Sequence, residues 1–86
     1  MKNTSKETIQ LHPKDNVMVA VVDLPEKTKL AGSKVTCLHP IPAGHKVAIR
    51  SVSAGEPILK YGQIIGFASK DILPGEHVHT HNVEMG

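Results

Sequence analysis

Three histidines near the end of the chain stand at alternate positions, in the stretch GEHVHTHN at residues 75–82. In an extended strand, His77, His79 and His81 would share one face, and an H-x-H pair could close on one metal ion. The outer two would lie roughly 13 Å apart along a strand, so a third ligand would have to come from elsewhere in the fold or from another chain. The alternative interpretation is an edge strand whose exposed polar face happens to be histidine.

A second group of polar residues follows a predicted turn in the stretch GHKVAIR. His45 and Lys46 lie at the turn, and Arg50 comes four residues after Lys46, on the same face of a predicted strand. Paired cations beside a tight turn suit a carboxylate or an enolate-like intermediate, because they stabilise negative charge that develops in a reaction. Solvated surface cations have the same sequence pattern, so this interpretation stays open.

Other polar residues offer fewer candidates for chemistry. Lys60 and Tyr61 stand beside another predicted turn and could add a second cation or a hydrogen-bond donor. Cys37 is the one cysteine, which excludes an internal disulfide framework, and we expect it to be a small buried hydrophobic residue. Four acidic residues are dispersed and form no paired-carboxylate motif: Asp15, Asp23, Glu56 and Asp71. No nucleophile elbow, phosphate loop or dinucleotide fingerprint occurs in the sequence.

The composition limits the classes of function. A chain of 86 residues makes one domain with a small core. The net charge is +2, and the basic residues are scattered along the chain. Tyr61 and Phe67 are the only aromatic residues, so both features argue against nucleic-acid binding. The longest apolar run, at residues 17–22, is far too short to span a membrane, and the N-terminal stretch lacks the apolar core of a signal peptide. We therefore expect a cytoplasmic protein with no membrane contact.

Glycine and proline interrupt the chain about every ten residues, and β-branched residues fill the intervals, so the sequence predicts an all-β fold of short strands. The stretch NVMVAVVDL is the best strand, and since both of its faces are apolar we expect it to be central. We predict a flexible tail at residues 1–7, the domain at 8–82, and a tail or the start of a linker at 83–86. A glycine turn is predicted at residues 61–63.

A degenerate repeat indicates one turn used three times, in the segments IPAGHKV (41–47), VSAGEPI (52–58) and ILPGEHV (72–78). Each has an apolar first residue, a glycine at the fourth position and an apolar seventh residue. We expect Gly44, Gly55 and Gly75 to adopt positive φ. The segment LPEKTKL (24–30) looks like a fourth copy without the glycine. The irregular spacing predicts a compact, strongly bent β unit and not a solenoid.

Four stretches together closely resemble the SAF domain of the altronate and galactarate dehydratase family: LHPKDNVMVAVVDLP, IPAGHKVAI, SAGEPILKYGQIIGFA and ILPGEHVHTHN. The resemblance covers residues 9–82 and implies a single small β-clip domain of the SAF type. Members of the family are lyases that remove water from sugar acids and depend on a divalent metal, usually iron. In the related sulfolactate sulfo-lyase this domain is a separate small subunit, so we expect either a natural small subunit or a domain excised from a longer enzyme.

The resemblance implies a domain that is inactive alone and completes the site of a large catalytic dehydratase subunit or domain. Iron(II) would be supplied mainly by that partner, and the substrate would be a sugar acid. The predicted residues are catalytic His45 and Lys46, substrate-binding Arg50, Lys60 and Tyr61, and metal-binding His79 and His81. Three alternatives remain: a sulfolactate sulfo-lyase subunit, a non-catalytic assembly module, and a ligand-binding protein of the antifreeze or flagellar-chaperone kind. Exposed strand edges make self-association into a homo-oligomer plausible.

Overall fold

The computed structural model describes residues 7–30 and 33–85, and the regular structure within them consists of β-strands, which confirms the all-β prediction. A four-stranded antiparallel sheet has the order β1-β2-β3-β6, and a three-stranded antiparallel sheet has the order β4-β5-β7. The strands are β1 (Thr8–Ile9), β2 (Val17–Ala20), β3 (Lys46–Ala48), β4 (Pro57–Lys60), β5 (Gln63–Ala68), β6 (His77–Val78) and β7 (Val83–Glu84).

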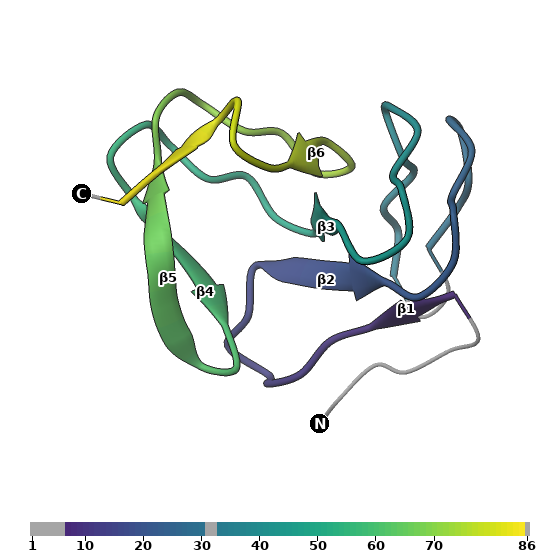
Figure 1. Cartoon of the computed structure of the whole chain (residues 1–86), viewed down its shortest axis with the longest axis horizontal. Helices are drawn as coiled ribbons and strands as arrows, with labels where there is room; N and C mark the ends of the chain where they lie inside the picture. The colour runs from purple at the N-terminus through teal and green to yellow at the C-terminus, as the bar shows by residue number, and fades with distance from the viewer. Residues whose placement is uncertain (1–6, 31–32, 86) are drawn as a thin grey trace.

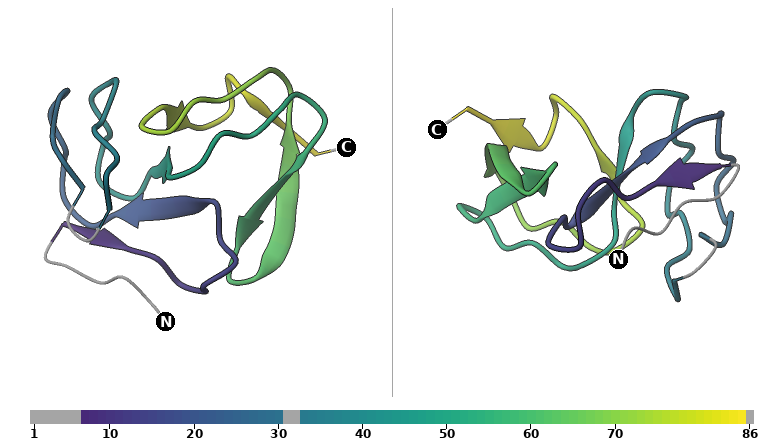
Figure 2. Two further views of the ribbon diagram at one scale, coloured as in Figure 1. Left: turned by 180° about the vertical axis from the view of Figure 1, so that it is seen from behind. Right: turned by 90° about the horizontal axis from the view of Figure 1, so that it is seen from below.

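The β4–β5 hairpin stands across one end of the four-stranded sheet, and the loops of residues 21–30 and 33–42 rise at its other end (Figures 1 and 2). β7 pairs with β5, so Val83 and Glu84 belong to a sheet and not to the tail that we expected there. The predicted N-terminal tail falls at residues 1–6, which lie outside the described part of the chain, and on Glu7. Within the described residues, none lies in a helix capable of spanning a bilayer.

β2 is central, as its two apolar faces predicted, and each face contributes to a separate core. Val17 packs in one core, and Met18 and Ala20 pack in the other. The strand is shorter than predicted, because it ends at Ala20 and the next two valines are exposed in a bend. The first core comprises Val17, Ala48, Val52, Ile58, Ala68, Ile72 and Val78, and the second comprises Met18, Ala20, Leu24, Leu30, Cys37, Ile41 and Val47.

The predicted turn occurs four times with the same hydrogen bond. In each copy the amide of the fifth residue donates to the carbonyl of the second, for example His45 N to Pro42 O at 3.0 Å and Glu76 N to Leu73 O at 3.0 Å. The fourth residue has positive φ in every copy: Lys27 (72°), Gly44 (84°), Gly55 (88°) and Gly75 (93°). The prediction of a reused turn is therefore confirmed, including the fourth copy, in which a lysine takes the place of glycine.

The four turns pair two by two through their first residues. Leu24 and Ile41 exchange two backbone hydrogen bonds of 2.8 Å, and Val52 and Ile72 exchange bonds of 2.9 and 2.7 Å. An aspartate precedes one copy in each pair and caps the turn of the other copy. Asp23 Oδ1 accepts from Ala43 N at 2.8 Å, and Asp71 Oδ1 accepts from Ala54 N at 2.9 Å. Two of the four dispersed acidic residues thus link the paired turns.

Gly75 is the turn glycine with the tightest surroundings. Its amide donates to Ala48 O at 2.7 Å, and its carbonyl accepts from Leu38 N at 2.8 Å. A Cβ atom at this position would lie 2.0 Å from the carbonyl oxygen of Thr36. Gly55 has a similar φ of +88°, but a Cβ atom there would meet nothing within 4 Å. A substitution at Gly55 therefore tests backbone strain alone, whereas one at Gly75 tests strain together with steric overlap.

We predict that Gly55→Ala lowers the free energy of unfolding by about 1 kcal/mol, the strain of a non-glycine residue at positive φ. Gly75→Ala adds a clash with backbone that cannot move aside cheaply, so its loss should be about 3 kcal/mol or more, enough to unfold a small domain. Urea unfolding followed by circular dichroism measures both. Equal losses for the two variants would contradict the close approach of Gly75 to Thr36.

Candidate functional site

The pairing of β3 with β6 brings two of the predicted site histidines together. His45 directly precedes β3, His77 begins β6, and the register places Val47 opposite His77. The Nδ1 atom of His45 and the Nε2 atom of His77 lie 2.8 Å apart, within hydrogen-bond distance. In the sequence these residues are 32 positions apart. The turn group and the C-terminal histidine group therefore form one site.

Asn82 determines the path of the chain after β6. Its buried side chain donates to His77 O at 2.9 Å and accepts from His79 N at 3.0 Å. Its own amide donates to His79 O at 3.1 Å, which closes a turn. The strand thus ends at Val78 and does not stay extended to residue 82. This turn holds His79 over the ring of His45.

The rings of His45, His77 and His79 form a stacked cluster, which we call the imidazole cluster. Ring centroids are 4.1 Å apart for His45 and His79 and 5.0 Å for His45 and His77, and the ring planes of these pairs meet at 20–21°. One nitrogen from each of the three residues lies within 4.8 Å of the other two. Within residues 7–30 and 33–85, this is the one set of three such ligand groups.

His81 lies at the edge of this cluster. Its ring centroid is 5.3 Å from that of His77, the two rings are tilted by 35°, and its side chain is exposed. The structure therefore groups His79 with His45 and His77, whereas the sequence suggested a pair of His79 with His81. The pairing of His79 with His81 stays a prediction.

Burial lowers the pKa of two rings of the cluster, His77 and His79. Burial first, and then the neighbouring imidazoles with His45 foremost, lower the pKa of His77 from 6.5 to about 4. The pKa of His79 is also lowered, first by burial and then by His45 and Lys46. Neutral imidazoles have a free lone pair, which both proton transfer and metal binding require.

Lys46 faces a hollow between the two sheets. The hollow has a volume of about 260 Å³ and is lined by Lys46 of β3, Ile65 of β5, the turn residues His79 and Thr80, and Val83 and Met85 at the C-terminal end. Burial lowers the pKa of Lys46, and the positive charge of Lys60 lowers it further. An amine with a lowered pKa and an imidazole thus share a largely apolar hollow.

The turn between β4 and β5 positions Lys60 and Tyr61. Tyr61 and Gly62 both have positive φ, as a two-residue hairpin turn requires, and the predicted turn is confirmed. The buried carboxylate of Asp15 accepts from the amides of Tyr61 and Gly62 at 3.0 and 2.8 Å. Lys60 Nζ lies 5.2 Å from the centroid of the Tyr61 ring. Asp15 thereby fixes the hairpin end that carries the second cation.

Arg50, the remaining predicted site residue, lies apart from this group. β3 ends at Ala48 and the chain bends at residues 49–50, so Arg50 does not continue the strand face of Lys46. Its guanidinium donates to Pro13 O at 3.2 Å. It lines a different hollow, with Lys14, Asn16, Ser51, Val52, Glu56, Pro57 and Leu59.

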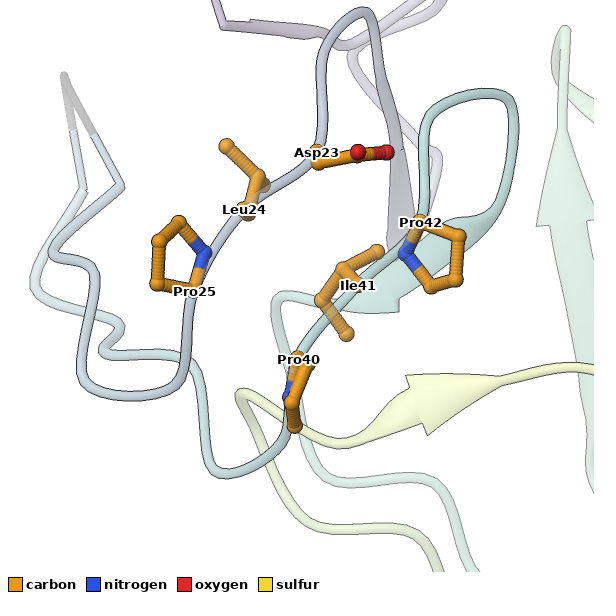
Figure 3. A pocket seen from close by; sticks show the side chains of 6 residues that line it. All are labelled: Asp23, Leu24, Pro25, Pro40, Ile41 and Pro42. Carbon is orange, nitrogen blue, oxygen red and sulfur yellow. The ribbon is translucent and has the colours of Figure 1, made fainter.

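A further hollow of about 320 Å³ lies at the bridge between Leu24 and Ile41. Figure 3 shows the rings of Pro25, Pro40 and Pro42 around it. Asp23 is the titratable residue in its lining, and its carboxylate already accepts from a backbone amide. This hollow therefore offers apolar surface and one carboxylate that is already hydrogen-bonded. The basic side chains lie close together at Lys46 and the imidazole cluster instead.

Sequence reasoning missed two things about the site. It placed His45 and His77 in different groups, although both follow copies of the repeated turn and the strands after those turns pair with each other. It also gave no role to Asp15 and Asn82, the buried polar residues that orient the hairpin and the histidine turn. The repeat was the signal for the first. The role of Asp15 depends on residues 46 and 47 positions away, whereas Asn82 contacts residues only three and five positions away.

Comparison with known proteins agrees with the family resemblance of the sequence motifs. The model of the altronate/galactarate dehydratase SAF domain matches residues 6–86. Altronate dehydratase of Bacillus subtilis (strain 168) is 40% identical over 81 residues, 92% of this chain and 16% of that protein. Altronate dehydratase of Escherichia coli (strain K12) is 42% identical over 76 residues, 86% of this chain and 15% of that protein.

A third relative differs in length. The alpha subunit of (2R)-sulfolactate sulfo-lyase of Paracoccus pantotrophus is 45% identical over 49 residues, which make up 57% of this chain and 73% of that subunit. The chain therefore spans about a sixth of the length of the dehydratases that it matches and most of the length of this subunit.

We predict that acid destabilises the metal-free domain through His77. Between pH 6.5 and pH 4 an unfolded histidine is protonated and the folded His77 is not, so the unfolded state binds more protons and the free energy of unfolding falls as the pH is lowered across this window. Above pH 6.5 this contribution is constant. Urea unfolding in a chelating buffer at pH 7.5 and pH 5 measures it. His77→Gln should show a smaller loss, and an unchanged loss would contradict the buried neutral state.

Proposed function

The chain belongs to the family of altronate/galactarate dehydratase SAF domains, and from this premise we propose that it is the SAF domain or small subunit of a hydro-lyase that dehydrates a sugar acid. In this proposal the domain is inactive alone and forms one wall of a site completed by a large catalytic domain or subunit. The observation that carries the proposal is the lowered pKa of Lys46 in a hollow that it shares with His79.

The reaction sets the tasks for these residues. A base must break the C–H bond next to the carboxylate, and the electron pair of that bond passes into an enediolate. As the enediolate collapses to a carbon–carbon double bond, the neighbouring C–O bond breaks, and the hydroxyl departs with a proton as water. The resulting enol becomes a keto acid. Positive charge near the carboxylate stabilises the enediolate, and an acid must protonate the leaving group.

Lys46 is our candidate for the base. Burial and the charge of Lys60 lower its pKa, so a larger fraction of its amine is uncharged near neutral pH. Lys60, whose charge reaches Lys46, is the candidate for holding the substrate carboxylate, with Tyr61 beside it on the hairpin turn. His45 lies next to Lys46 in the chain, and its ring stacks on that of His79. In this proposal a proton passes from the His45–His79 pair to the leaving hydroxyl. Arg50 lines a different hollow, so any contact that it makes with the substrate would lie outside the hollow of Lys46.

The family also implies a divalent metal, which we propose to be iron(II) held mainly by the large partner. Neutral imidazole nitrogens are suitable ligands for such an ion, and the imidazole cluster provides them beside the hollow. When bound, the ion would act as a Lewis acid toward oxygen atoms of the substrate.

A second candidate function is that of the small subunit of a sulfolactate sulfo-lyase, in which sulfite leaves in place of water. The sulfo-lyase alpha subunit of Paracoccus pantotrophus supports it, because that subunit is 45% identical to this chain over 49 residues. The same base and the same cations would serve either leaving group. A turnover assay of the chain with its large partner on altronate, galactarate and sulfolactate in the presence of iron(II) separates the two candidates.

We predict that Lys46→Met lowers kcat of the assembled enzyme at least about 100-fold, because the base is lost. Lys46→Arg should be equally inactive, since an arginine keeps the charge but does not release its proton. Lys29→Met, at an exposed lysine of the 24–41 segment, is the matched control and should keep wild-type turnover.

Association with the large partner must be measured on the same variants, by gel filtration of the complex. If Lys46→Met assembles and turns over normally, Lys46 is not the base. If less of the complex forms but each complex keeps full turnover, the domain is an assembly module.

A further inference from the structure

We propose that the imidazole cluster is a transition-metal site of this domain itself, formed by His45, His77 and His79 and able to bind an ion without the large partner. This goes beyond the metal of the proposed function, which the partner would mainly supply. It also stands without the lyase assignment, because it depends only on the donor atoms, their spacing and the residues that hold them.

The spacing of the donor nitrogens requires only small movements. A four-coordinate ion bound at 2.0–2.1 Å holds its ligand nitrogens roughly 3.4 Å apart. The contact between His45 Nδ1 and His77 Nε2 is 2.8 Å, and the nitrogens of all three residues lie within 4.8 Å of one another. The widest of these gaps would therefore have to close by at most roughly 1.4 Å, which a rotation of the side chains can supply.

The short contact between His45 and His77 contains a proton that an ion can replace. Two nitrogen lone pairs 2.8 Å apart repel, so one of these nitrogens must carry a hydrogen that the other accepts. A metal ion between the rings would accept both lone pairs, while the hydrogen moves to the other nitrogen of its ring or to water. The lone pair of an imidazole lies in the ring plane, so binding must also turn the rings out of their stack.

The backbone already holds the ligands in place. His45 and His77 sit on paired strands, where the antiparallel register fixes their separation. His79 is held by two hydrogen bonds with the buried Asn82, through its amide and through its carbonyl. Ligands mounted on rigid elements lose little conformational freedom on binding, which favours affinity.

The donor set indicates the class of metal. Three imidazoles suit zinc, iron(II), cobalt, nickel or copper, whereas magnesium and calcium prefer oxygen ligands. Glu76, the carboxylate next to His77 in the chain, accepts from Leu73 N and closes its own turn. Three protein ligands leave a coordination position open, as catalytic zinc sites do. His79 also lines the hollow with Lys46, so the open position would border the proposed substrate site.

The test is metal binding by the tag-free 86-residue chain alone, measured by calorimetry with Zn²⁺ and by the absorption of Co²⁺ at pH 7.5. We expect one ion per chain for each of these metals and no binding of Mg²⁺. His45→Ala, His77→Ala and His79→Ala should each weaken binding at least about 100-fold, because each removes a direct ligand. His39→Ala, an exposed histidine outside the cluster, is the control and should bind as the wild type does.

His81→Ala distinguishes the two histidine sets. It should weaken binding less than His45→Ala, and the reverse order would overturn the proposed set in favour of a site built on His79 and His81. Absence of one-to-one binding by the wild-type chain, or binding that survives all three substitutions, would overturn the site altogether. Should a variant fold poorly, NMR of the wild-type histidine rings decides: Zn²⁺ must shift the signals of His45, His77 and His79 and leave His39 unchanged. Lyase activity enters none of these measurements, so the proposed function and this site can fail separately.

Discussion

A single turn with a positive φ at its fourth residue governs this fold. The turn occurs four times, and its copies pair through the backbone of their first residues, Leu24 with Ile41 and Val52 with Ile72. Each pair reverses the chain sharply, so strands of two to six residues can wrap around two small cores. Side chains from the middle of the chain and from its end therefore meet within one small domain.

The same constraint creates the chemistry of the site. Because β3 and β6 follow two copies of the turn and pair with each other, His45 and His77 are forced into contact. Grouping basic side chains in a partly buried place disfavours their charged forms. The pKa of His77 falls to about 4 for that reason, and that of Lys46 is lowered as well. Both shifts thus follow from burial and from the proximity of other basic groups.

Much of the fold was predictable because its determinants are local. Glycines at the fourth position of a repeat indicate positive φ, and a strand with two apolar faces indicates a central place, so the turns and β2 were predicted correctly. The site was predictable only in part, because it depends on which distant segments pair. Proximity of His45 to His77 requires the β3–β6 register, and the role of Asp15 requires the hairpin to return to it.

In the proposed function the domain works with a large partner, and the position of the site is compatible with that role. The hollow lies between the two sheets, where Lys46 comes from one and Ile65 and Val83 from the other. Its volume of about 260 Å³ is below the usual range of roughly 300–1,000 Å³ for sites that enclose a small molecule. Met85 at its rim is 81% exposed, so apolar surface continues outward from the hollow. A proton transfer that must exclude water needs a second wall, and a covering surface would bury this rim along with the substrate.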